Sequence, residues 1–93
     1  MDILTLRRRI DDVDLKVIRL LSKRIKIVQK ICDLKVKNNL SVYQPKRESS
    51  MLKKRKNFAK KYSLREQFIV DLFGRIFEES RYLQEKCQAP LKK

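Results

Sequence analysis

Two cations stand near the centre of an apolar stripe that recurs at helical spacing through the first third of the chain. Arg24 and Lys35 are eleven residues apart, almost a whole number of helical turns, so they point the same way about 16 Å from each other. Because unpaired buried cations are costly, we expect this face to meet an anion, either a protein carboxylate or a ligand. The apolar members of the stripe are Leu6, Ile10, Val13, Val17, Leu20, Leu21, Val28, Ile31 and Cys32.

Four further polar residues lie on or beside faces that are expected to point inward. Ser80 and Gln84, four residues apart, share the apolar face of a C-terminal helical pattern, where neutral hydrogen-bonding groups can converge on one ligand. Arg47 and Glu48 flank the inward face of a middle helical pattern at its first turn. Each pair also has a structural explanation. Ser80 and Gln84 can bond to neighbouring helices, and a helix dipole favours a glutamate at its start.

Taken together, these residues carry more positive than negative charge. A structural network of ion pairs would be closer to balanced, because surplus buried charge destabilises a fold. We therefore expect a small anionic ligand, a carboxylate that arginine can hold with a two-pronged hydrogen bond. The candidate residues are Arg24, Lys35, Arg47, Glu48, Ser80 and Gln84.

One long helix should position the two stripe cations. It is expected to begin at Asp2, which suits an N-cap, and to run to about Lys37, a length of about 50 Å. Nothing in a protomer of this size is long enough to cover such a stripe. Arg7 lies seventeen residues before Arg24, about 25 Å away along the helix, so one chain cannot bring both to one small ligand. If both are functional, the helix serves two sites in an intertwined symmetric dimer.

Two shorter helices are expected to follow. After a loop over residues 40–45, the second helix spans roughly 46–61. Ser63 should cap the third helix, with Glu66 completing a capping box, and the helical pattern fades over residues 86–90. With one glycine, two prolines and no strand signal, residues 1–93 are expected to form a single all-α domain of three helices. The residues of the second helix that should face inward are Met51, Leu52, Phe58, Ala59 and Tyr62.

Composition argues against several other classes. The chain has no histidine, and Cys32 and Cys87 show no metal-ligand spacing, so we expect no metal site and two buried free thiols. No apolar run approaches the roughly 18 residues of a membrane span, and residues 1–12 lack the apolar region of a signal peptide. These features favour a soluble cytoplasmic protein that does not span a membrane.

The formal net charge of +14 keeps a different class of function open. Lysines and arginines crowd residues 53–61, and such a field attracts nucleic acid as well as small anions. These lysines do not alternate with aromatic residues and form no recognisable binding motif, so a solvated basic face explains them more simply. A basic helical nucleic-acid-binding module therefore stays an alternative.

In the order and spacing of its polar residues, the chain resembles the all-helical (AroQ-type) chorismate mutases over nearly its whole length. Each shared motif is short, and the resemblance depends on their combined order. The motifs are Leu6-Arg7, Ile10-Asp11, Asp14, Leu20-Leu21, Arg24, Lys35, Pro45-x-Arg47-Glu48, Glu79-Ser80 and Gln84.

The resemblance implies a homodimer of three-helix protomers whose long first helices pair. Such enzymes convert chorismate to prephenate in phenylalanine and tyrosine biosynthesis. By match, Arg7 would reach the site of the partner chain. Arg24 and Arg47 would hold the substrate carboxylates with help from Ser80.

For the reacting atoms, the resemblance implies that Lys35 and Gln84 bond the ether oxygen and that Glu48 bonds the ring hydroxyl. The rearrangement is a concerted single-molecule step that needs no nucleophile, metal or cofactor. It needs a compact substrate conformer and donors aimed at the oxygen of the breaking bond. Gln44, expected among the substrate-binding residues, departs from the family, where an acidic residue is common at this position. Since that position mainly offers its backbone, we expect activity with altered affinity.

Two alternatives on the same fold also fit the sequence. An isochorismate-pyruvate lyase shares the fold and most of the cationic site. Lyases of this type tend to lack residues equivalent to Glu48 and Ser80, which favours the mutase. The other alternative is a catalytically weak relative that acts through a partner protein.

Overall fold

The chain is all-helical in its described part. The structure is a computed structural model that describes residues 1–38 and 45–88, and these contain three α-helices and no strand. The helices are α1 (Ile3–Lys37), α2 (Pro45–Lys61) and α3 (Glu66–Gln88). The predicted all-α class and the order of the helices are confirmed. Most of the predicted loop at 40–45 and the end of the last helical pattern lie outside the described residues.

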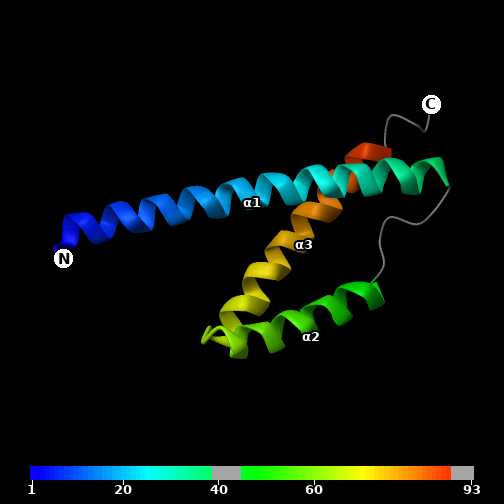
Figure 1. Cartoon of the computed structure of the whole chain (residues 1–93). Coiled ribbons are helices and arrows are strands. Elements are labelled where there is room, and N and C mark those ends of the chain that lie inside the picture. Colours follow the sequence, from blue (N-terminus) through cyan, green and yellow to red (C-terminus); the bar gives the residue numbers. More distant parts are fainter. Residues whose placement is uncertain (39–44, 89–93) are drawn as a thin grey trace.

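Helix α3 joins the other two helices. It begins beside the end of α2 and runs to the C-terminal half of α1, so it packs against both, as Figure 1 shows. The N-terminal half of α1 projects past this contact with no other described element beside it (Figure 1). The molecule is therefore elongated, 58 × 25 × 15 Å. Its longest dimension is close to the length of α1, about 52 Å for 35 residues.

The first helix begins where the sequence predicts. Asp2 has an extended backbone, and its Oδ1 accepts a hydrogen bond of 2.8 Å from the backbone N–H of Thr5. This bond favours the charged carboxylate and lowers the pKa of Asp2 below its usual value. At the other end, the backbone N–H of Asn38 bonds to the carbonyl of Leu34, and the Asn38 side chain donates to the same oxygen. Helix α1 is thus capped at both ends by its own sequence.

The predicted capping box at Ser63 is wrong. Ser63 belongs to the end of α2, where it adopts a left-handed backbone with φ of 57°. Its N–H bonds to the Lys60 carbonyl at 3.2 Å, and the N–H of Leu64 bonds to the Ala59 carbonyl at 2.8 Å. These two bonds form a Schellman motif, which places Ser63 where glycine is usual. Serine is a common N-cap, so the pattern before Glu66 could not reveal that it closes the preceding helix instead.

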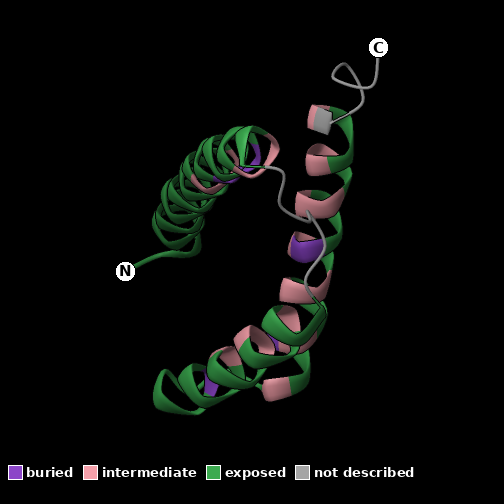
Figure 2. Cartoon of the chain, turned by 90° about the vertical axis from the view of Figure 1, so that its right-hand side faces the viewer, coloured by how far each residue is buried: buried purple, intermediate pink, exposed green. Residues whose placement is uncertain are grey.

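The hydrophobic core of the single chain is thin. Figure 2 shows buried and intermediate residues gathered where α3 meets its neighbours, whereas most of α1 is exposed. Of the predicted inward residues of α2, Ala59 is buried, but Phe58 and Tyr62 are exposed. Their inward placement is not borne out within one chain. The buried apolar residues are Val28, Cys32, Ala59, Ile69 and Phe77.

Cys32 and Cys87 are joined by a disulfide that links α1 to α3. The prediction of two buried free thiols is therefore wrong. Only Cys32 is fully buried, and the Cα atoms of the two residues lie 6.6 Å apart although 55 positions separate them in sequence. Spacing along the chain could not reveal this pair because the crossing of α1 and α3 creates it.

Within the described residues, no helix is both long enough and apolar enough to cross a membrane.

Candidate active site

One cavity of about 110 Å³ lies among the three helices and collects six of the eight residues predicted from the sequence. Helix α1 contributes Arg24 and Lys35 to its wall, and the first turn of α2 contributes Arg47 and Glu48. Helix α3 contributes Ser80 and Gln84. We call this space the cationic cavity, and its lining residues are Arg24, Val28, Ile31, Lys35, Arg47, Glu48, Met51, Phe77, Ser80, Arg81 and Gln84.

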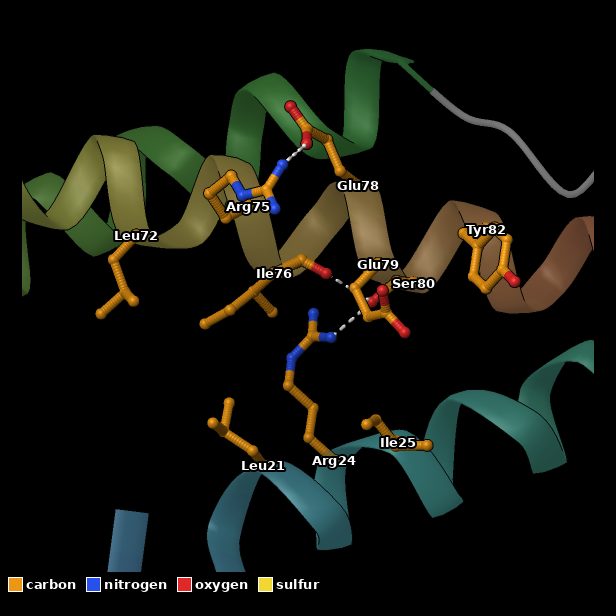
Figure 3. Close-up of a pocket in the computed structure, with 10 residues that line it drawn as sticks. All are labelled: Leu21, Arg24, Ile25, Leu72, Arg75, Ile76, Glu78, Glu79, Ser80 and Tyr82. Carbon is orange, nitrogen blue, oxygen red and sulfur yellow. Dashed lines mark hydrogen bonds and ion pairs between the residues drawn. The ribbon is translucent and has the colours of Figure 1, made fainter. Parts of the chain in front are cut away.

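Arg24 is fixed by contacts with α3. Its Nη1 donates a hydrogen bond of 2.6 Å to Ser80 Oγ, which itself donates to the carbonyl of Ile76 at 3.0 Å (Figure 3). The guanidinium also lies over the ring of Phe77, 5.7 Å from its centroid. These hydrogen bonds of Ser80 therefore orient the Arg24 side chain towards the space between α1 and α3.

The environment of Arg24 favours an anion. Burial lowers the pKa of the Arg24 guanidinium, and the positive charge of Arg55 lowers it further. Among the described residues, no carboxylate forms an ion pair with Arg24. A half-buried cation that is repelled by a second cation gains stability when an anionic ligand binds beside it.

Gln84 presents a buried amide to the same cavity. Its Oε1 is buried and has no hydrogen-bond partner among the described residues. An unsatisfied buried polar atom costs about 1–3 kcal/mol, so the Gln84 amide keeps hydrogen-bonding capacity that no described residue uses. Lys35 is partly buried across the cavity on α1. The two side chains thus bring a charged donor and an amide to one space.

Glu48 is held from the opposite helix. Arg81 on α3 donates from Nη1 to Glu48 Oε1 at 2.5 Å, and both side chains are largely shielded from water. Glu48 also lies in the first turn of α2, where the helix dipole favours a carboxylate. The contact with Arg81 therefore sets the direction of the Glu48 side chain.

The charges around the cationic cavity are unbalanced. Four cationic side chains and one carboxylate line it, and the carboxylate is already paired with Arg81. The surplus that the sequence predicts is therefore present in three dimensions. A small ligand with more than one carboxylate would offset this positive charge.

Two predicted residues do not join this group. Arg7 is exposed in the N-terminal half of α1, about 25 Å along the helix from Arg24. Gln44 lies outside the described residues. Within one chain, the cationic cavity is built without Arg7.

Arg81 is the lining residue that sequence reasoning missed. It directly follows Ser80 and comes three positions before Gln84, so it lies on the flank of the same helical face. The chain has 25 lysines and arginines, which made one more arginine in a C-terminal helix an uninformative observation.

A larger apolar hollow lies beside the cationic cavity and shares Arg24 and Ser80 with it. Its volume is about 410 Å³, and Figure 3 shows it between α1 and α3. It does not include Lys35 or Gln84, so the chemistry-bearing groups do not converge there. We call it the apolar hollow, and its lining residues are Leu21, Arg24, Ile25, Leu72, Arg75, Ile76, Glu78, Glu79, Ser80 and Tyr82.

Within the described part of the chain, no group of three or more cysteine, aspartate or glutamate residues is arranged to hold a metal ion.

The chain is similar to known proteins over most of its length. The family model for chorismate mutase type II matches residues 6–85, most of the chain. The chain is 39% identical over 85 residues to a bifunctional chorismate mutase/prephenate dehydratase of Buchnera aphidicola subsp. Schizaphis graminum, an alignment that covers 91% of this chain and 22% of that protein. It is 34% identical over 79 residues to a T-protein of Enterobacter agglomerans, covering 85% of this chain and 21% of that protein.

A shorter relative matches over most of its own length. A chorismate mutase of Methanocaldococcus jannaschii is 21% identical over 81 residues, which cover 87% of this chain and 82% of that protein. By contrast, the chain spans about a fifth of the length of the Buchnera and Enterobacter relatives above. The match over residues 6–85 shows that the chain belongs to the chorismate mutase type II family.

Proposed function

We propose that residues 1–93 form one cytoplasmic chorismate mutase domain, which rearranges chorismate to prephenate and so serves phenylalanine and tyrosine biosynthesis. The main support is the convergence of Arg24, Lys35, Glu48 and Gln84 on a single positively charged cavity. Membership of the chorismate mutase type II family supports the same reaction.

The cations would bind chorismate through its two carboxylates. Arg24, which is oriented by its hydrogen bond to Ser80, would hold one of them. Arg47, in the first turn of α2, would hold the other. Holding both ends fixes the substrate in the compact conformer in which the reacting carbons meet. Such positioning can supply a large share of the rate enhancement in a single-molecule reaction.

Lys35 and Gln84 would act on the bond that breaks. In the rearrangement the ether carbon–oxygen bond breaks while a carbon–carbon bond forms, and negative charge develops on the ether oxygen. A lysine ammonium and an amide N–H preorganised around that oxygen stabilise the transition state more than the ground state. Glu48 would accept a hydrogen bond from the ring hydroxyl and so hold the ring in place.

The working form would be a homodimer in which each cavity borrows Arg7 from the partner. Residues 1–23 are all exposed in the single chain, yet they carry most of the apolar stripe. A second copy of α1 could cover this stripe. The apolar hollow beside Arg24 offers a surface for the partner helix, which would carry its Arg7 towards the cationic cavity.

The direct test is incubation of the purified chain with chorismate, following loss of its ultraviolet absorbance and identifying the product by chromatography. The expected product is prephenate, formed without added metal or cofactor. A folded chain that consumes no chorismate would contradict the proposal.

Incubation with isochorismate separates the mutase from the lyase alternative. A lyase would release pyruvate and salicylate, whereas we expect little or no pyruvate. The nucleic-acid alternative is tested in parallel with a labelled DNA duplex. Salt-sensitive binding that survives Lys35→Ala, in a chain without mutase activity, would favour that alternative.

A further inference from the structure

We propose that Arg81 is a positioning residue of the active site, which holds Glu48 through Oε1 so that Oε2 faces the hydroxyl of the substrate. This inference rests on the proposed function, because Glu48 gains its role from the ring hydroxyl. It assigns a task to the one cation of the cationic cavity that lies outside the predicted set.

The ion pair of Arg81 differs from the other ion pairs among the described residues. Arg81 and Glu48 have side-chain exposures of 34% and 19%, compared with 73% and 39% for Lys60 and Glu66. The exposed pair between Arg75 and Glu78 lies within α3 itself. Exposed pairs of this kind contribute little to stability because water and salt screen them.

A shielded pair is also weak evidence for a stabilising role. Removing two charges from water costs free energy that their attraction only partly offsets, so apolar replacements are often as stable. The position of the pair is therefore the more informative fact. Glu48 and Arg81 both line the cationic cavity, at the point where α2 and α3 face each other.

The contact with Arg81 uses one of the two carboxylate oxygens of Glu48. Arg81 Nη1 contacts Oε1 of Glu48, and a carboxylate has a second oxygen with its own lone pairs. Without Arg81, Glu48 would lie among the three remaining cations that line the cavity and could turn towards one of them. Arg81 thus keeps Glu48 from neutralising a cation that binds a substrate carboxylate.

The test compares chorismate with its analogue that lacks the ring hydroxyl, using the full chain. With chorismate, Arg81→Met should lower kcat/KM about tenfold. This is the size of loss seen in metalloenzymes when a residue that orients a functional side chain through a hydrogen bond is removed. Its effects on kcat and on KM should follow those of Glu48→Gln. With the analogue, Arg81→Met should change kcat/KM by less than about twofold, because no hydroxyl is present to be positioned.

A double-mutant cycle measures whether Arg81 acts through Glu48. In the Glu48→Gln background, Arg81→Met should have almost no further effect on chorismate turnover. Lys60→Met is the matched control, since it also removes one positive charge and one ion pair between α2 and α3. It should leave kcat/KM within about twofold of the unmodified chain on both substrates.

Arg81→Gln provides a second variant if Arg81→Met does not fold, because the glutamine amide can still donate to Glu48. It should lose less activity on chorismate than the methionine variant and none on the analogue. Equal losses on both substrates, or equal losses with and without Glu48→Gln, would show that Arg81 does not act through Glu48 and would overturn the inference. An inactive unmodified chain would instead overturn the proposed function.

Discussion

The two halves of α1 carry the same apolar periodicity but meet different surroundings. In the C-terminal half, residues 21–37, only 8% of the surface of Val28 is exposed. Arg24 and Lys35 in this half line the cationic cavity. In the N-terminal half, residues 3–20, Ile10 is 58% exposed, and no described element lies beside it. A helical stripe therefore indicates that a face will be covered, but it does not indicate which chain covers it.

We propose a separate task for the N-terminal half on the basis of this difference. An exposed apolar face of this length is unusual for a folded monomer and favours association with a second copy. Arg7 lies on the same half as the uncovered stripe. If two copies pair along α1, one half of the helix builds its own cavity and the other half completes the cavity of its partner.

The largest expected effect tests whether both halves take part in catalysis. Lys35→Ala should lower kcat by about 10²–10³-fold, since removal of a preorganised donor costs about 3–4 kcal/mol of barrier.

Arg7→Ala should cause a large loss as well, although Arg7 is remote from the cavity of its own chain. Steady-state chorismate kinetics measure both variants. Arg8→Ala is the control, because its side chain points about 100° away from that of Arg7 on the helix. An Arg7→Ala variant as active as Arg8→Ala would remove the N-terminal half from the site.

The second prediction tests what covers the N-terminal half. Val13 is exposed in the single chain, so Val13→Asp would be harmless in a monomer but would bury an unpaired carboxylate in a dimer, at a cost of several kcal/mol. In sedimentation equilibrium, we expect the unmodified protein to have the mass of a dimer and the Val13→Asp variant to have the mass of a monomer. Asp12→Asn, the adjacent position, should leave the mass unchanged. Unmodified protein that sediments as a monomer would refute the pairing of the two helices.

The third prediction concerns the C-terminal half alone. The disulfide between Cys32 and Cys87 closes a long loop, so reduction should lower the free energy of unfolding by about 2–4 kcal/mol. Urea unfolding with and without a reductant measures this change, and thiol labelling of the unfolded, unreduced chain should find no free thiol. A Cys87→Ser variant should be insensitive to the reductant. Two reactive thiols in the untreated protein would contradict the disulfide.

The smallest expected effect lies outside both halves of α1. Ser63 has a left-handed backbone, which is unfavourable for a residue with a side chain, so Ser63→Gly should stabilise the fold by about 0.5–1 kcal/mol. Ser63→Ala keeps the Cβ atom and should bring no such gain. Thermal unfolding at fixed protein concentration compares the two. A glycine variant no more stable than the alanine variant would argue against the Schellman motif.

The sequence predicted well those features that depend on local spacing. Helix α1 from its N-cap at Asp2 to Lys37 follows from a continuous helical period, and the joint placement of Arg24 and Lys35 follows from eleven residues of helix. Ser80 and Gln84 share the cavity for the same reason, since residues four apart lie on one face.

Features that depend on how helices cross were not predictable in this way. The crossing of α1 and α3 brings Cys32 to Cys87, and the approach of α3 to α2 brings Arg81 to Glu48. Neither contact leaves a periodic signal in the sequence. Ser63 was misassigned for a local reason, because serine suits a helix start more often than a left-handed helix end.

The shared site is tested most directly by mixing two inactive variants, Arg7→Ala and Lys35→Ala, after joint unfolding and refolding. In a mixed dimer, the cavity of the Arg7→Ala chain keeps its own Lys35 and receives an intact Arg7 from its partner. Random pairing makes half of the dimers mixed, each with one intact site, so the mixture should recover about a quarter of the unmodified activity. A mixture no more active than either variant alone would contradict a cavity that is completed by the partner chain.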